Sequence, residues 1–92
     1  MIQETISSNN APVAVGPYSP AVRAGDFIYI SGQLPIDPTT GQLVSDDIRI
    51  QTEQVLKNIE SLLAEAGLNM SYVLKTTAFV KNMEEFAAMN EV

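Results

Sequence analysis

The sequence predicts one small domain of mixed α and β structure, in which a β-hairpin precedes a strand–helix–strand unit. Three observations support this. The pair Gly25-Asp26, suited to a type II′ turn, separates two short apolar segments. Apolar residues then recur at helical spacing from Ile48 to Ala66. Finally, Tyr72–Lys81 is rich in β-branched and aromatic residues and predicts a strand. The 92 residues suffice for a single domain with one modest core, so association of subunits would help to stabilise it.

The first half of the chain is predicted to be mainly extended. Met1–Ile6 is expected to form a short strand, and the prolines in Ser7–Pro20 favour a loop because proline donates no ladder hydrogen bond. Ala21–Ala24 and Phe27–Ser31 form the hairpin. The second of these strands is almost continuously apolar, which predicts that both its faces are covered, by helices on one side and by another subunit on the other. Pro35–Gly41 is a turn cluster.

The long helix has clear start and stop signals. Asp46 or Asp47 is expected to cap its N-terminus, and Gly67 is expected to end it in a left-handed conformation. Glu53 and Lys57 have the spacing of a favourable ion pair on one helix face.

A second helix is predicted after Asn82, with Glu85 completing a capping-box arrangement. Its apolar stripe runs toward Val92, where the sequence has no C-cap or stop signal. When a strand–helix–strand unit is followed by a helix with an apolar stripe, the chain normally continues to a further strand that helps to cover this stripe. We therefore expect residues 1–92 to be a C-terminally incomplete domain.

Composition limits the possible functions. The net charge of −6 disfavours binding to nucleic acid, because the acidic chain would be repelled by phosphates. The chain has no Cys and no His, so thiolate nucleophiles, an imidazole base and the usual ligands of zinc sites are missing. There is also no leader-like N-terminus and no apolar run of the roughly 20 residues needed to cross a membrane. A cytoplasmic location without membrane contact is therefore expected.

Several sequence blocks resemble one known family. GPYSPAV (16–22), FIYISGQLPIDPTTGQL (27–43), the helix QTEQVLKNIESLLAEAG (51–67) and VLKTTAFVKNMEEFAAMNEV (73–92) resemble the RidA/YjgF family of reactive-intermediate imine deaminases, also described as L-PSP-like endoribonucleases. The resemblance covers essentially residues 1–92 as a single domain. It implies an α+β fold of the chorismate-mutase-like type, a mixed sheet with two helices on one face, in a homotrimer with a central barrel-like core and clefts between subunits.

The resemblance also implies an activity. Members of the family hydrolyse 2-imino acids or their enamine forms, which pyridoxal-phosphate-dependent dehydratases release, to 2-keto acids such as 2-ketobutyrate and ammonia. No metal or organic cofactor is implied. The family's carboxylate-gripping Arg and water-holding Glu are expected beyond Val92, and these roles are not transferred to Arg23 or Arg49.

Five residues are predicted to line the substrate pocket. By resemblance, Tyr18 is the pocket tyrosine, although a loop aromatic can equally seal a core. Ser31 and Gly32 lie at the end of the apolar strand and offer a hydroxyl and an approachable backbone, although Ser-Gly also ends many strands. Gln33 is a polar neighbour. By resemblance, Asn90 matches a pocket amide of the family, although it can equally be an exposed helix residue without a binding role.

Other reactive side chains are given a structural interpretation. Lys57, Lys75 and Lys81 are expected to be solvated rather than to form Schiff bases. The acidic pairs 46–47 and 84–85 fit first helical turns better than catalytic dyads. Two alternative functions remain open: a non-catalytic trimer that binds small carboxylic metabolites, and an endoribonuclease or translation inhibitor, which the charge and the lack of His oppose.

Overall fold

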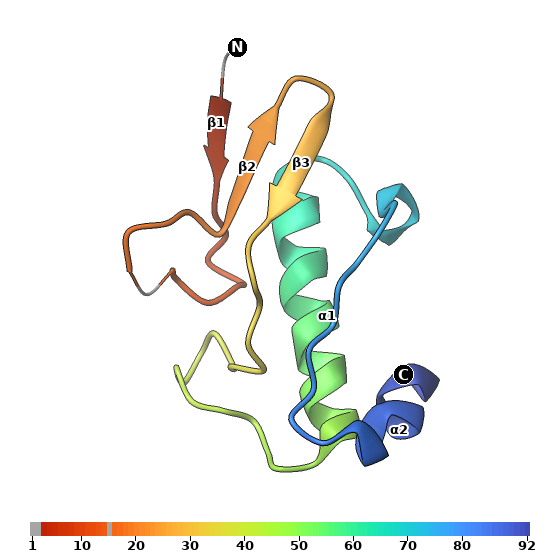
Figure 1. Cartoon of the computed structure of the whole chain (residues 1–92). Coiled ribbons are helices and arrows are strands. Elements are labelled where there is room, and N and C mark those ends of the chain that lie inside the picture. Colours follow the sequence, from red (N-terminus) through yellow and green to blue (C-terminus); the bar gives the residue numbers. More distant parts are fainter. Residues whose placement is uncertain (1–2, 15) are drawn as a thin grey trace.

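The computed structural model describes residues 3–14 and 16–92. A three-stranded sheet covers one end of a long helix, and a second, short helix lies at the other end of that helix (Figure 1). The predicted α+β class is confirmed. Among the described residues, no helix is long and apolar enough to cross a membrane. In chain order the elements are β1 (Gln3–Ile6), β2 (Ala21–Ala24), β3 (Phe27–Ile30), α1 (Ile48–Glu65), the 3-10 helices η1 (Met70–Tyr72) and η2 (Met83–Glu85), and α2 (Phe86–Glu91).

The sheet has the order β1-β2-β3 and both strand pairs are antiparallel. Ala24 pairs with Phe27, so Gly25 and Asp26 form a two-residue turn. Gly25 has φ of 60°, and Asp26 has no positive φ, which agrees with the predicted type II′ turn. The hairpin is thus confirmed, as is a first strand; residues 1–2 of the strand predicted over 1–6 lie outside the described residues.

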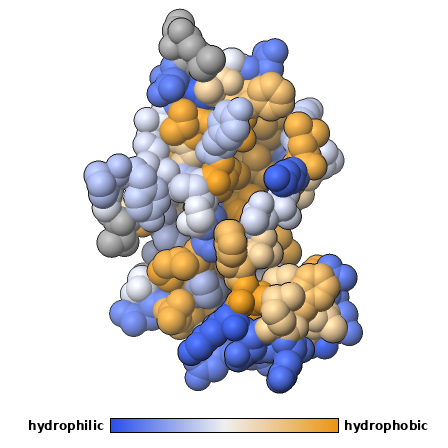
Figure 2. All heavy atoms as spheres, viewed as in Figure 1, coloured by the Kyte–Doolittle hydropathy of each residue, from blue (hydrophilic) through white to orange (hydrophobic). Residues whose placement is uncertain are grey.

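The two faces of the sheet differ in burial. Ile6 and Ala21 are buried on the face toward α1, where they form a small core with Leu62. On the opposite face, Phe27 is 54% exposed and Tyr29 is 65% exposed. The predicted helix layer therefore lies on one face of the sheet, and the outer face of the second hairpin strand is open within the described part of the chain. Figure 2 shows hydrophobic side chains at the surface in the upper part of the molecule, where the sheet lies. Coverage by a second subunit stays a prediction.

Both ends of α1 follow the sequence signals. The Asp47 carboxylate accepts a hydrogen bond of 2.8 Å from the backbone N–H of Arg49, which identifies Asp47 as the N-cap. At the other end, Gly67 has φ of 78°, and the N–H groups of Gly67 and Leu68 donate to the carbonyls of Ala64 and Leu63. These two bonds are a Schellman motif. The predicted helix and its end are confirmed.

The strand predicted over Tyr72–Lys81 is wrong. Tyr72 belongs to η1, and residues 73–82 run beside α1 as extended chain without a sheet partner (Figure 1). Leu74 is 84% exposed and Phe79 is 93% exposed. Strand propensity largely reflects packing on a pleated, half-buried surface, and here no neighbouring strand provides that surface. The predicted strand–helix–strand unit and the parallel part of the mixed sheet are therefore not present among the described residues.

The second helix is shorter than predicted. The chain enters it through η2, and regular α-helix begins only at Phe86. The predicted capping box is wrong, because the Asn82 side chain accepts no backbone hydrogen bond. Its amide instead donates to the Glu85 carboxylate at 3.5 Å. A salt bridge from Arg49 to Glu91 ties α2 to the first turn of α1.

Candidate functional site

The hairpin brings two of the predicted pocket segments together. β2 and β3 are antiparallel, and Ala21 pairs with Ile30. The residues just before β2 therefore lie beside those just after β3. The backbone N–H of Ser31 donates to the carbonyl of Pro20 at 3.0 Å, which extends the ladder by one bond. The Ser31 hydroxyl lies 2.9 Å from the carbonyl oxygen of Ser19 and 3.0 Å from that of Pro20, and it donates to these carbonyls.

Four predicted residues lie in the two segments that adjoin at this end of the hairpin, and we call them the Ser31 cluster: Tyr18, Ser31, Gly32 and Gln33. Tyr18 directly precedes the carbonyls that Ser31 contacts, and its side chain is half exposed. Gln33 donates from its side-chain amide to the carbonyl of Ser31 at 3.2 Å. A methyl group added at Gly32 would meet no atom within 4 Å, so the surface is open at this point. The cluster can therefore present two polar side chains and a half-exposed phenol to a ligand.

Asn90, the fifth predicted residue, is placed elsewhere. It lies on α2 and is exposed. Its neighbour Glu91 is bound to the first turn of α1, whereas the sheet lies over the last turns of α1 (Figure 1). Within residues 3–14 and 16–92, no hydrogen bond joins Asn90 to the Ser31 cluster. A ligand-binding role for Asn90 stays a prediction.

Both arginines are engaged away from the Ser31 cluster. The Arg23 guanidinium donates to the carbonyl of Ala66 at 3.4 Å and so links β2 to the end of α1. Arg49 pairs with Glu91, and the hydrogen bond and charge of that carboxylate raise the pKa of Arg49 above its ordinary value. Both arginines thus make contacts within the fold, in agreement with leaving them out of the catalytic assignment.

The lysines are solvated, as predicted. Lys57 pairs with Glu53 at 3.2 Å on the surface of α1, which also confirms the predicted ion pair. Lys75 and Lys81 are exposed on the extended segment before α2. In the part of the chain that the structure describes, no group of three or more acidic side chains lies close enough to hold a metal ion.

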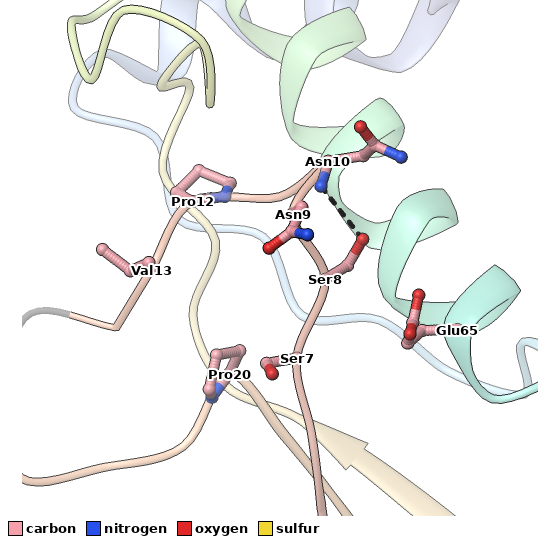
Figure 3. Close-up of a pocket in the computed structure, with 8 residues that line it drawn as sticks. All are labelled: Ser7, Ser8, Asn9, Asn10, Pro12, Val13, Pro20 and Glu65. Carbon is pink, nitrogen blue, oxygen red and sulfur yellow. Dashed lines mark hydrogen bonds between the residues drawn. The ribbon is translucent and has the colours of Figure 1, made fainter.

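One surface hollow is lined in part by Pro20, the residue that directly precedes β2. It has a volume of about 360 Å³ and is open to solvent. Figure 3 shows that its walls come from the segment after β1, from Pro20 and from the last turn of α1. Ser8 shapes this wall, because its hydroxyl accepts a hydrogen bond of 3.1 Å from the backbone N–H of Asn10. None of the five predicted pocket residues lines the hollow; its lining residues are Ser7, Ser8, Asn9, Asn10, Pro12, Val13, Pro20 and Glu65.

Sequence reasoning missed one polar residue of the interior. Asn58 on α1 is fully buried, with 0% of its surface exposed. Its amide nitrogen donates to the carbonyls of Leu34 and Ile36 at 3.2 and 3.0 Å, and its amide oxygen accepts from Gln54 at 2.8 Å. Its position four residues before Leu62, on the apolar side of the helix, is the signal in the sequence that points to burial.

Residues 8–92 match the model of the family described as Endoribonuclease L-PSP. The chain belongs to this family. The predicted resemblance to RidA/YjgF proteins is thereby confirmed, because the Endoribonuclease L-PSP relatives include proteins named for RutC, for Rid and for imine deaminase activity.

Three similar proteins match almost the whole chain. A RutC family protein of Pyrococcus horikoshii is 50% identical over 91 residues, which are 99% of this chain and 72% of that protein. The 2-iminobutanoate/2-iminopropanoate deaminase of Salmonella typhimurium is 42% identical over 97% of this chain and 69% of its own length. The crystal structure of YyfA from Yersinia pestis, a Rid family protein of unknown function, superposes with a TM-score of 0.95 at 44% identity and covers 98% of this chain and 71% of that one.

Proposed function

We propose that this protein hydrolyses 2-imino acids and their enamine forms to 2-keto acids and ammonia. Two observations support the proposal. The Salmonella relative that carries this activity in its name is 42% identical to nearly the whole chain. The structure also brings Tyr18, Ser31, Gly32 and Gln33 to one end of the hairpin, where the hydroxyl of Ser31 is held in a fixed orientation. The fixed Ser31 hydroxyl is the observation that carries the mechanism.

The reaction needs water, positioning and stabilisation of charge. Water adds to the imine carbon, so that a C–O bond forms while the imine nitrogen takes a proton. The carbinolamine then loses ammonia as the C–N bond breaks and the remaining hydroxyl loses its proton to give the keto group. Because the imine is intrinsically reactive, holding the substrate and the attacking water in the right geometry can supply much of the acceleration.

Ser31 suits the water-orienting part of this reaction. A serine hydroxyl has one proton and two lone pairs. Its proton is directed to the carbonyls of Ser19 and Pro20, at 2.9 and 3.0 Å, so a lone pair is left for a ligand. In our proposal Ser31 accepts a hydrogen bond from the attacking water or from the imine N–H. It does not donate to the substrate carboxylate. The open surface at Gly32 lets the substrate approach the backbone closely.

The proposed assembly is a homotrimer. Its support is the outer face of the sheet, where Phe27 and Tyr29 are more than half exposed. Burying such aromatic surface between subunits is favourable and would add to a small core. Native mass spectrometry tests this directly: a threefold multiple of the chain mass supports the trimer, and a monomer at micromolar concentration contradicts it.

One specific observation favours a second candidate, a non-catalytic binding module for small carboxylic metabolites. The four residues of the Ser31 cluster include no carboxylate that could hold or activate the attacking water, whereas their hydroxyl, amide and backbone groups suit hydrogen bonding to a ligand. A weak binder of keto acids without turnover is the corresponding function.

A coupled assay distinguishes the two candidates. A pyridoxal-phosphate-dependent threonine dehydratase generates 2-iminobutyrate, and formation of 2-ketobutyrate is followed with and without the protein. Calorimetry with 2-ketobutyrate is run on the same sample. Faster keto-acid formation supports the deaminase, and binding without acceleration supports the binding module. Neither binding nor acceleration by folded protein contradicts both.

A further inference from the structure

The chain between β3 and α1 is long and holds few buried apolar residues. Residues 31–47 form no helix or strand in the structure. An isolated bridge between Ile36 and Leu43 and a few backbone hydrogen bonds within residues 34–44 close a local turn, and these bonds do not join the segment to the rest of the fold. Leu34 is 61% exposed and Leu43 is 63% exposed, so burial of these leucines does little to fix the segment. Long connections without regular structure are often functional. Such a connection needs other interactions to hold one conformation.

Asn58 supplies such an interaction from the middle of α1. Its two amide protons go to two carbonyls of the segment, those of Leu34 and Ile36, at 3.2 and 3.0 Å. Its oxygen accepts from Gln54 at 2.8 Å, which fixes the plane of the amide. The side chain is completely buried, so each of these bonds forms away from competing water. The backbone of the segment is therefore pinned to the helix at residues 34 and 36.

Ser31 pins the same segment on its other side. Its backbone and its hydroxyl both bind the chain that precedes β2. Gly32 and Gln33 are the only residues between these two anchors. Their conformational freedom is limited because the chain is fixed immediately before and immediately after them. Both belong to the Ser31 cluster, through which the proposed substrate is held.

We infer that Asn58 is a positioning residue for the substrate site, which acts by holding residues 32–33 against α1 rather than by touching substrate. The inference rests on the proposed function and adds to it a buried residue outside the cluster. If Asn58 only stabilised the fold, its replacement would weaken ligand binding no more than replacement of another buried residue of α1 that contributes equally to the free energy of unfolding. The two roles therefore predict different results when a matched pair of variants is compared.

The matched pair is Asn58→Leu and Leu62→Ala. Leucine replaces the amide at similar volume and removes both bonds to the segment. Leu62, one turn further along α1 and 1% exposed, belongs to the core and has no bond to residues 31–36. Stability is measured by denaturation in urea, and affinity for 2-ketobutyrate and kcat/KM are measured at a temperature where both variants are folded.

We expect Asn58→Leu to weaken 2-ketobutyrate binding and to lower kcat/KM by about 10-fold or more, because small displacements of positioning groups can cost up to about 100-fold. Leu62→Ala is expected to change either value by less than about 2-fold. Equal effects of the two variants, or no effect of Asn58→Leu on a wild-type protein that binds, would overturn the inference. A folded wild-type protein that neither binds nor turns over would instead overturn the proposed function on which the inference rests.

A milder variant decides the question if Asn58→Leu does not fold. Gln54→Leu removes the donor that fixes the Asn58 amide plane and leaves the bonds to the segment in place. We expect binding of 2-ketobutyrate to weaken by about 3-fold in this variant. An unchanged dissociation constant would contradict a positioning role.

Discussion

Replacement of Ser31 by alanine tests the proposed role of its hydroxyl. The change removes the donor to the carbonyls of Ser19 and Pro20, at 2.9 and 3.0 Å. The carbonyl of Pro20 keeps its bond from the backbone N–H of residue 31, so only one acceptor loses its partner. One net hydrogen bond in a half-buried site contributes about 1 kcal/mol to the free energy of unfolding. For a domain of this size, that corresponds to a fall in Tm of roughly 4–8 °C.

The effect on function should depend on the ligand. 2-Ketobutyrate lacks an imine N–H, so its dissociation constant should change by less than about 2-fold in Ser31→Ala. Turnover of 2-iminobutyrate needs the lone pair that orients water or the imine, and loss of one such bond should lower kcat/KM by roughly 10-fold. The assays are calorimetry with 2-ketobutyrate and the dehydratase-coupled formation of keto acid.

Ser61→Ala is the matched control. The Ser61 hydroxyl also donates to a backbone carbonyl, that of Lys57 at 3.0 Å, but within α1. Because alanine has the higher helix propensity, Ser61→Ala should not lower stability and should leave turnover unchanged. If Ser31→Ala left turnover unchanged, or lowered affinity for 2-ketobutyrate as much as turnover, the assignment of Ser31 as an acceptor for water or imine would be refuted.

Three further predictions concern the fold. Leu62→Ala, at a residue 1% exposed, should lower the free energy of unfolding in urea by about 2–5 kcal/mol, and a loss below 1 kcal/mol would show that this core is not packed as described. Gly67→Ala should lower the free energy of unfolding by about 1–2 kcal/mol, because Gly67 has a φ of 78° that alanine adopts only with strain. Gly32→Ala should leave this free energy unchanged, since Gly32 has no positive φ and an added methyl group would meet no atom within 4 Å; equal losses in the two variants would contradict the Schellman motif at the end of α1. Asp47→Ala should lower the free energy of unfolding, measured by thermal denaturation, by about 1 kcal/mol, and Asp46→Ala should lower it much less, since only Asp47 accepts the capping hydrogen bond. A larger loss with Asp46→Ala would show that Asp46 is the N-cap.

The elements that sequence predicted well are those encoded locally. The turn at Gly25-Asp26 and the two ends of α1, at Asp47 and Gly67, each depend on one or two residues whose backbone preferences or side-chain bonds act within a few positions. Such signals do not depend on the rest of the fold. The hairpin in turn brings the chain before β2 beside Ser31, so much of the candidate site was predictable as soon as the hairpin was recognised.

The elements that sequence predicted poorly depend on neighbours distant in the chain. Residues 73–81 have strand composition, but a strand exists only where another strand offers its hydrogen-bonding edge. Asn58 was overlooked because its burial depends on two carbonyls more than twenty residues earlier, at Leu34 and Ile36. The position of Asn90 likewise depends on how α2 docks on α1, a contact between segments distant in the sequence that a local pattern does not show.

The acceleration of 2-iminobutyrate hydrolysis tests the central claim most directly. The wild-type protein, shown by circular dichroism to be folded, is added to a threonine dehydratase reaction, and the appearance of 2-ketobutyrate is recorded against a sample without it. We expect keto acid to form faster in proportion to protein concentration, and more slowly with Ser31→Ala at the same concentration. A folded protein that gives the same rate as buffer at every concentration would contradict the proposed deaminase activity.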